Sequence, residues 1–152
     1  MSLEQEVELI RRFPLFSKIP PAKQKLLCFS SERLTYSAGQ EIFHERDVGN
    51  ECYVVIDGTV EISIDQEKGP PLVINKLGRN ELLGEIAICG NVPRTATATA
   101  QSRLEVLRIS KDLFNSVIRE NPDAALELIR ILSLRLANMN THIANMPKPS
   151  RA

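Results

Sequence analysis

The chain has 152 residues, of which 43% are hydrophobic and 25% are charged. This is the composition of an ordinary globular protein, and the length is typical of one domain. The 19 basic and 19 acidic side chains balance to a formal charge of zero. Proteins that bind nucleic acid generally carry a basic surplus, so we expect no nucleic acid as a partner of this chain. No apolar run approaches the ~20 residues that cross a membrane, so we also expect no membrane span.

Residues that form disulfides or bind metals are few and far apart. Cys28, Cys52 and Cys89 are odd in number and widely separated, which predicts reduced thiols in the cytoplasm. His44 and His142 have no second histidine or cysteine at metal-ligand spacing, so we expect no metal site. The N-terminus lacks the features of a secretory signal peptide, and nucleophile-elbow and phosphate-loop motifs are absent. The sequence therefore predicts a cytoplasmic protein that is not an enzyme.

We expect a single domain over residues 1–146, followed by a polar, proline-rich tail at 147–152. Its first zone is a helical lead-in at 9–33, where Pro21 suits the first turn of a short helix. Its second zone, at 34–109, has many short strands separated by turns, as in an all-β sandwich, roll or barrel.

Two patterns within the strand-rich zone predict local structure. Asp57-Gly58 lies between the apolar run 52–56 and the alternating run 59–65, and this spacing predicts a two-residue hairpin. The run 95–100 alternates threonine with alanine. Such small residues leave two alternatives open, a tightly packed interior or a ligand close to the backbone.

Residues 110–146 are predicted to be helical. Ser110 is the expected N-cap of one helix, and Asn121 and Pro122 are the expected cap and first residue of a longer one. Two apolar stripes run along the longer helix. The first has the 4-3 spacing of a coiled coil and consists of Ala125, Ile129, Leu132, Leu136, Met139, Ile143 and Met146. The second consists of Ala124, Leu128, Ile131 and Leu134. One stripe can pack on the β-zone and the other on a second copy of the chain; the alternative is one broad face buried within a single chain.

The segment at 83–97 carries the candidate chemistry and reads Leu-Gly-Glu-Ile-Ala-Ile-Cys-Gly-Asn-Val-Pro-Arg-Thr-Ala-Thr. Gly84 would let the backbone approach a ligand closely, and a short helix from Glu85 would present free N–H groups. Arg94 could bind a phosphate through two parallel hydrogen bonds. The alternative is that Glu85 and Arg94 form a structural salt bridge.

This segment resembles the phosphate-binding cassette of the cyclic nucleotide-binding domain family, found in protein kinase A regulatory subunits, cyclic-nucleotide-gated channels and the bacterial catabolite activator protein. The family motif is Phe-Gly-Glu, a loop, then Arg, a small residue and Ala; residues 83–85 and 94–96 match it, with Leu83 in place of the aromatic. Similarity extends over about residues 9–145. It implies an antiparallel β-roll, or jelly-roll-like double-stranded β-helix, with N-terminal helices and a C-terminal lid helix. Arg46 and Asn80 depart from the family, which usually has glycine there.

The resemblance also implies how a nucleotide would bind. Arg94 would pair with the cyclic phosphate, and Glu85 would accept a hydrogen bond from the ribose 2′-hydroxyl. Further implied contacts are Gly84, the backbone N–H groups of Ile86, Ala87 and Ala96, and the base-pocket residues Ile62, Ile74 and Asn75. A base cap is implied on the C-terminal helix, in the stretch that contains Asn138, Asn140 and Thr141, with Asn140 and Thr141 as the favoured candidates. Thr95 is the residue that bears on the choice of base, and it leaves cAMP and cGMP both open. We take cAMP as the favoured ligand and cGMP as the second candidate.

The expected function is that of a cyclic nucleotide sensor whose C-terminal helix closes over the base. A homodimer through that helix is the expected assembly. No helix-turn-helix follows the helix, so we expect either a stand-alone sensor or a regulatory domain of a longer protein. The alternative is a dimerisation or interaction module that keeps the β-roll but binds no nucleotide.

Overall fold

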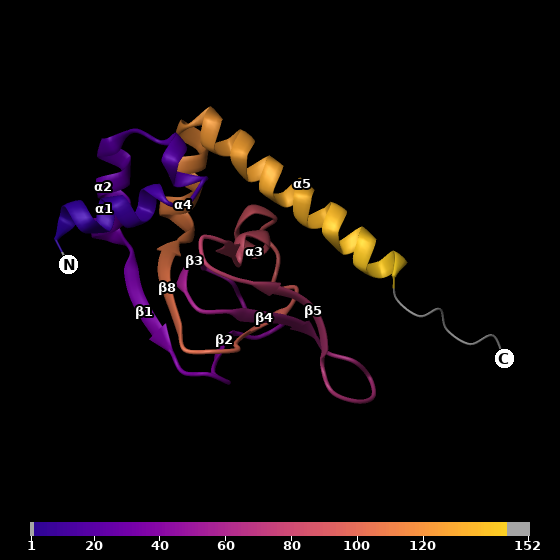
Figure 1. Ribbon diagram of the computed structural model, residues 1–152. Helices are drawn as coiled ribbons and strands as arrows, with labels where there is room; N and C mark the ends of the chain where they lie inside the picture. Colours follow the sequence, from indigo (N-terminus) through magenta and orange to yellow (C-terminus); the bar gives the residue numbers. More distant parts are fainter. Residues whose placement is uncertain (1, 146–152) are drawn as a thin grey trace.

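The computed structural model describes residues 2–145, apart from the side chains of residues 142 and 143. Its N-terminal part is helical, as the sequence predicts (Figure 1). The elements there are α1 (Leu3–Arg11), the 3₁₀ turn η1 (Phe16–Lys18) and α2 (Pro21–Ser30). Ser2 and Gln5 cap α1 reciprocally, and Pro21 is the first residue of α2.

Eight strands form two antiparallel four-stranded sheets, which confirms the predicted β-roll. The first sheet has the order β1 (Glu32–Tyr36), β8 (Leu104–Ser110), β3 (Glu51–Asp57) and β6 (Leu82–Leu83). The second has the order β2 (Glu41–Phe43), β7 (Thr97–Ala100), β4 (Val60–Ile64) and β5 (Leu72–Leu77).

The hairpin predicted at Asp57-Gly58 is wrong. The strands on either side of it, β3 and β4, belong to different sheets and do not pair with each other. Gly58 has a φ of +100°, and a side chain there would collide with the carbonyl oxygen of Arg103. The dipeptide therefore provides a corner at which the chain crosses from one sheet to the other.

The small residues of β7 fill the interior of the roll. Ala98 and Ala100 are fully buried and pack in one cluster with Val60, Leu104 and Val106. Of the two alternatives for this run, the tight interior is therefore correct for these two alanines. A second cluster joins the lead-in helices to the other side of the first sheet, through residues such as Phe13, Phe16 and Phe114.

Three further helices follow in the chain: α3 (Glu85–Cys89) lies between β6 and β7, and α4 (Lys111–Glu120) and α5 (Pro122–Ala144) come after β8. Ser110 caps α4 as predicted, accepting a hydrogen bond from the Leu113 N–H. The side chain of Asn121 instead donates to the Val117 carbonyl, so its amide is turned toward α4.

The two stripes of α5 have different environments. Ala124 and Leu128 are buried in the core, whereas Leu134 of the same stripe is exposed. On the heptad stripe, Ile129 is 59% exposed and Leu136 is 62% exposed. Met146 and the tail at 147–152 lie outside the described residues. Past its first turns, α5 extends beyond the body of the roll, over α3 and alongside β5 (Figure 1).

Candidate functional site

The cassette begins where β6 ends. Gly84 has a φ of +83°, a left-handed conformation that favours glycine. A side-chain carbon at this position would also lie 2.7 Å from Nη1 of Arg94. Gly84 thus lets the chain turn from β6 into α3 while Arg94 lies directly against the backbone.

Arg94 is buried, with only 4% of its surface exposed. Its Nη1 donates to the Gly84 carbonyl at 2.9 Å, and its Nη2 donates to the Glu51 carbonyl at 2.7 Å. The guanidinium lies over the ring of Phe43, 4.2 Å from the centroid. Its Nε is buried and has no hydrogen-bond partner within the described part of the chain. Among the described residues, the carboxylate that approaches it is that of Glu51, at 4.0 Å.

The β2–β3 loop wraps around the backbone of Arg94. Arg46 N–H donates to the Arg94 carbonyl at 2.7 Å, and Arg94 N–H donates to the Asp47 carbonyl at 2.8 Å. Arg46 has a φ of +75° and Asn80 a φ of +70°. Both positions, where the sequence departs from the expected glycine, therefore keep a left-handed backbone.

Glu85 is the first residue of α3 and is only 3% exposed. Its Oε1 accepts a hydrogen bond from Nη1 of Arg135, and Nη2 of Arg135 donates to the Leu82 carbonyl. The alternative prediction, a salt bridge between Glu85 and Arg94, is wrong for the described residues, because the cation paired with Glu85 is Arg135.

Sequence reasoning missed Arg135, although the pattern contains a signal for it. Arg135 follows Leu128 by seven residues and Ile131 by four, so it lies on the apolar stripe that packs against the protein. A charged residue on such a stripe needs a partner in the body of the domain. The long side chain reaches that partner at the cassette.

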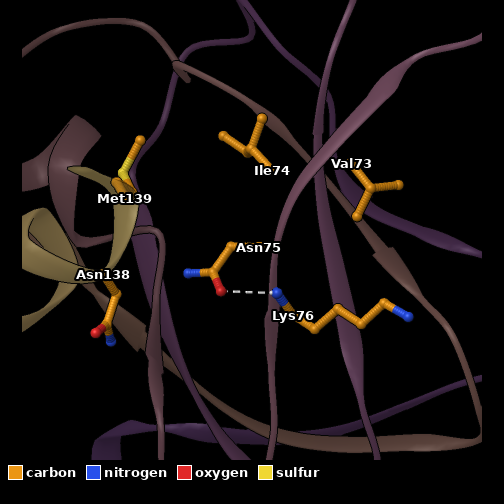
Figure 2. Close-up of a pocket in the computed structure, with 6 residues that line it drawn as sticks. All are labelled: Val73, Ile74, Asn75, Lys76, Asn138 and Met139. Atoms are coloured by element: carbon orange, nitrogen blue, oxygen red, sulfur yellow. Dashed lines mark hydrogen bonds between the residues drawn. The ribbon is translucent and has the colours of Figure 1, made fainter. Parts of the chain in front are cut away.

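A cavity of about 350 Å³ lies between β5 and α5, which is large enough for a small ligand. It is lined by Val73, Ile74, Asn75, Lys76, Asn138 and Met139 (Figure 2). A β-bulge shapes its strand wall: Ile62 pairs with Asn75 and Ser63 with Val73, so Ile74 is the extra residue. The bulge directs Ile74 and Asn75 toward α5, while Val73 and Lys76 point away from it.

The structure brings together some of the predicted base-pocket residues and not others. Ile74 and Asn75 line the cavity, and Ile62 is half-buried without lining it. From α5, the lining residues are Asn138 and Met139; the candidate caps Asn140 and Thr141 are exposed and do not line it. Asn138 lies three residues beyond Arg135, about 4.5 Å along the helix axis. The cavity is therefore next to the cassette.

The remaining cassette residues differ in accessibility. Ile86 and Thr95 are exposed, whereas Ala87 and Ala96 are buried. As residues of the first turn of α3, Ile86 and Ala87 have N–H groups without partners inside the helix.

The cysteines near the cassette are held in the thiol form. Burial, followed by the charge of Glu85, raises the pKa of Cys52 well above its usual range, and the same two causes raise the pKa of Cys89. A raised pKa leaves little of the reactive thiolate at neutral pH. In the part of the chain that the structure describes, no cluster of three or more His, Cys, Asp or Glu side chains is arranged to hold a metal ion. Within that same part, none of the helices has the length and apolar character needed to cross a membrane.

A β-roll with an arginine-containing cassette and a covering C-terminal helix defines a class of regulatory ligand-binding domain. Comparison with known proteins agrees: the family model for the cyclic nucleotide-binding domain matches residues 33–121, more than half of the chain. The chain belongs to the cyclic nucleotide-binding domain family.

Relatives show how widely such a domain is used. The chain is 25% identical to the CRP-like cAMP-activated global transcriptional regulator of Mycobacterium tuberculosis, over 91% of this chain and 62% of the regulator. It is 31% identical to lysophospholipase NTE1 of Chaetomium globosum, over 71% of this chain but 7% of that protein. The chain thus spans less than two thirds of the length of these relatives. Among solved structures, the sensor domain of the transcriptional regulator DNR from Pseudomonas aeruginosa has the same fold, with a TM-score of 0.79, 22% identity and 98% coverage of both chains.

Proposed function

We propose that this domain is a sensor that binds a cyclic nucleotide, with cAMP as the favoured ligand, and that it catalyses no reaction itself. The observation that carries the proposal is the state of Arg94. Its guanidinium is buried and donates to two carbonyl oxygens, which orient the group, while the carboxylate that approaches it, that of Glu51, stays 4.0 Å away. A buried charge is costly unless it is paired. The cyclic phosphate would supply a negative charge in closer contact than Glu51 does, and Nε, which has no hydrogen-bond partner among the described residues, marks unused bonding capacity at this point.

The ribose and base have matching groups nearby. Glu85 has a second oxygen, Oε2, beyond the one bound by Arg135, and it is the proposed acceptor for the 2′-hydroxyl. The cavity between β5 and α5 is the proposed base site. Asn75 Oδ1 accepts from the Lys76 N–H at 2.8 Å, which directs the amide nitrogen of Asn75 outward as a donor. Asn138, from the facing helix, would supply the complementary amide, in place of the favoured candidates Asn140 and Thr141.

We further propose that α5 acts as the lid and also joins two copies of the chain. The support is the division of its surface: one stripe is buried at Ala124 and Leu128, whereas Ile129 and Leu136 of the heptad stripe are exposed. A sensor of this kind would respond in the cytoplasm, consistent with the three free cysteines.

Titration calorimetry with cAMP and cGMP on nucleotide-stripped protein tests the proposal. We expect saturable binding with one ligand per chain, and the ratio of the two dissociation constants identifies the preferred base. Arg94→Ala should weaken binding by about 1.5–3 kcal/mol, ten-fold or more, because it removes a charge-assisted contact.

Arg79→Ala is the matched control, because Arg79 is an exposed arginine paired with Asp57 and not with the cassette. Its affinity should equal that of the wild type. Thermal unfolding of both variants checks that the loss in Arg94→Ala is not a loss of folded protein. If neither nucleotide bound the wild type at millimolar concentration, the alternative of a non-binding interaction module would replace the proposal.

A further inference from the structure

Arg135 connects the lid helix to the cassette. It lies in the half of α5 that extends beyond the core, where Leu134 and Leu136 are exposed. Among the described residues, the hydrogen bonds that join a side chain of α5 to the β-roll are the two made by Arg135, to Glu85 and to the Leu82 carbonyl. Its side chain is 18% exposed even though its backbone is on an outlying helix. The guanidinium thus reaches into the domain and binds both ends of the turn that leads into α3.

The effect on Glu85 follows from its burial. A carboxylate that is almost fully buried needs a partner to offset its lost hydration, and Arg135 is the cation that the structure pairs with it. Arg135 bonds to Oε1 of Glu85 and leaves Oε2 as an acceptor. Because the same guanidinium also holds the Leu82 carbonyl, the position of the carboxylate is fixed relative to the backbone of the cassette.

We propose that Arg135 is a positioning residue that determines the preference of this site for a ribose over a deoxyribose. The inference rests on the proposed function, since it concerns the sugar of the same ligand. Arg135 does not touch the sugar; it holds the Glu85 carboxylate in one orientation, so that Oε2 can accept a hydrogen bond from the 2′-hydroxyl. A hydrogen bond to a charged, fixed acceptor is stronger than one to a neutral or mobile acceptor.

The placement of Arg135 on α5 makes the effect reciprocal. A sugar hydroxyl that holds Glu85 in the orientation bound by Arg135 stabilises the docked helix, and the docked helix strengthens binding of that hydroxyl. Asn138 and Met139, one turn further along, are brought to the base cavity by the same docking. Recognition of the sugar and the position of the lid helix therefore both depend on the ion pair between Arg135 and Glu85.

The test is to measure dissociation constants for cAMP and 2′-deoxy-cAMP with the wild type and with Arg135→Gln. The wild type should bind cAMP roughly ten-fold or more tightly than the deoxy ligand. In Arg135→Gln the preference should fall to about three-fold or less, mostly through weaker binding of cAMP. Arg130→Gln is the matched control, because Arg130 is on the same helix and pairs with Glu127 within it. It should keep the preference of the wild type.

Each other outcome has a definite meaning. If Arg135→Gln loses affinity for both ligands equally, Arg135 supports only the fold, and the inference is overturned. If the variant binds cAMP more tightly than the wild type does, Arg135 competes with the sugar, and the inference is overturned as well. Arg135→Lys keeps the charge but cannot hold Glu85 and Leu82 as a planar fork, so an intermediate preference is expected; it decides the matter if Arg135→Gln does not fold. A wild type that binds cAMP without any preference overturns this inference alone, whereas a wild type that binds neither ligand overturns the proposed function as well.

Discussion

Two arginines at one site, the buried Arg94 and the half-buried Arg135, have different electrostatic surroundings. Arg135 faces the carboxylate of Glu85, whereas Arg94 faces carbonyl oxygens and the ring of Phe43. Carbonyl groups and an aromatic face stabilise a cation but leave its net charge in place. Arg135 would have to give up a close ion pair to take an anionic ligand, whereas the carboxylate nearest Arg94, that of Glu51, is 4.0 Å away. Arg94 is therefore the better suited of the two arginines to bind an anion.

Arg46 provides a test of backbone strain near the cassette. Its φ of +75° is unfavourable for a residue with a side chain. Its side chain is exposed, and its 3.6 Å ion pair with Glu45 is worth little. Arg46→Gly should keep the N–H bond to the Arg94 carbonyl and raise the free energy of unfolding by about 1 kcal/mol. Urea denaturation would measure the change.

Asn80→Gly is the control for this prediction. Asn80 also has a left-handed backbone, with a φ of +70°, but asparagine tolerates this conformation better than arginine does. The increase in the free energy of unfolding should therefore be smaller for Asn80→Gly than for Arg46→Gly. Equal gains at both positions would show that the side chain of Arg46 is not the source of the strain.

Tyr53 makes stability depend on pH in the alkaline range. Burial, followed by the charge of Glu51, raises its pKa from 10.0 to about 12. The unfolded chain therefore releases the phenolic proton at a lower pH than the folded chain does. The contribution of Tyr53 to stability is present below pH 10 and is lost as the pH rises from 10 toward about 12.

Urea unfolding at a series of pH values between 9 and about 12 would detect this loss. Tyr53→Phe keeps the ring beside Phe43, at a centroid separation of 6.1 Å in the wild type, and removes the ionisable group. The variant should show a shallower decline above pH 10. A decline as steep as that of the wild type would assign the effect to other groups, among them Tyr36, whose pKa burial also raises.

At the scale of elements, the predictions succeeded where local signals acted alone. Pro21 begins α2 and Ser110 caps α4, as predicted, because the start of a helix depends on residues within its first turn. The hairpin at Asp57-Gly58 failed because a turn sequence fixes the direction of the backbone but not the strand that the chain next pairs with. The bulge at Ile74 likewise depends on the register between β4 and β5, which is a relation between strands.

The heptad stripe of α5 gives a prediction at the same scale. Ile129 and Leu136 are exposed, so replacing either with glutamate should leave the fold intact. If a second copy packs on this stripe, Ile129→Glu and Leu136→Glu should weaken the dimer, because each would bury a charge in an apolar seam. Sedimentation at several protein concentrations would measure the change.

Ala137→Glu is the matched control for the dimer, because Ala137 is exposed and lies off both stripes of the helix. It should dimerise like the wild type. A wild type that remained monomeric at every concentration would contradict the dimer, and equal weakening by all three substitutions would assign the effect to helix charge.

For the whole molecule, the site could be predicted from the sequence to the extent that one short segment contains it. Gly84, Glu85 and Arg94 share the cassette, and their spacing is visible in the chain. Arg135 and Asn138 come from a helix some fifty residues away, and their part depends on how α5 crosses the roll. The path of α5 is set by the packing of Ala124 and Leu128 in the core. The positions of Arg135 and Asn138 therefore depend on contacts made by other residues of the helix.

This arrangement predicts how the whole domain responds to ligand. A nucleotide that contacts the cassette, β5 and α5 together binds the folded chain but not the unfolded one, so it stabilises the fold by mass action. At one hundred times the dissociation constant the gain is about 2.7 kcal/mol. For a chain of this size, that corresponds to an increase in Tm of roughly 5–10 °C. Differential scanning calorimetry with increasing cAMP would measure it.

Truncation separates the contribution of α5 from that of the cassette. A chain ending at residue 121 keeps Arg94 and Glu85 but loses Arg135, Asn138 and the buried Leu128. It should unfold at a lower temperature than the full chain, and its Tm should rise less with the same cAMP concentration. If cAMP raised the Tm of the truncated chain as much as that of the full chain, the cassette and the roll would account for the whole binding free energy, and α5 would take no part in binding.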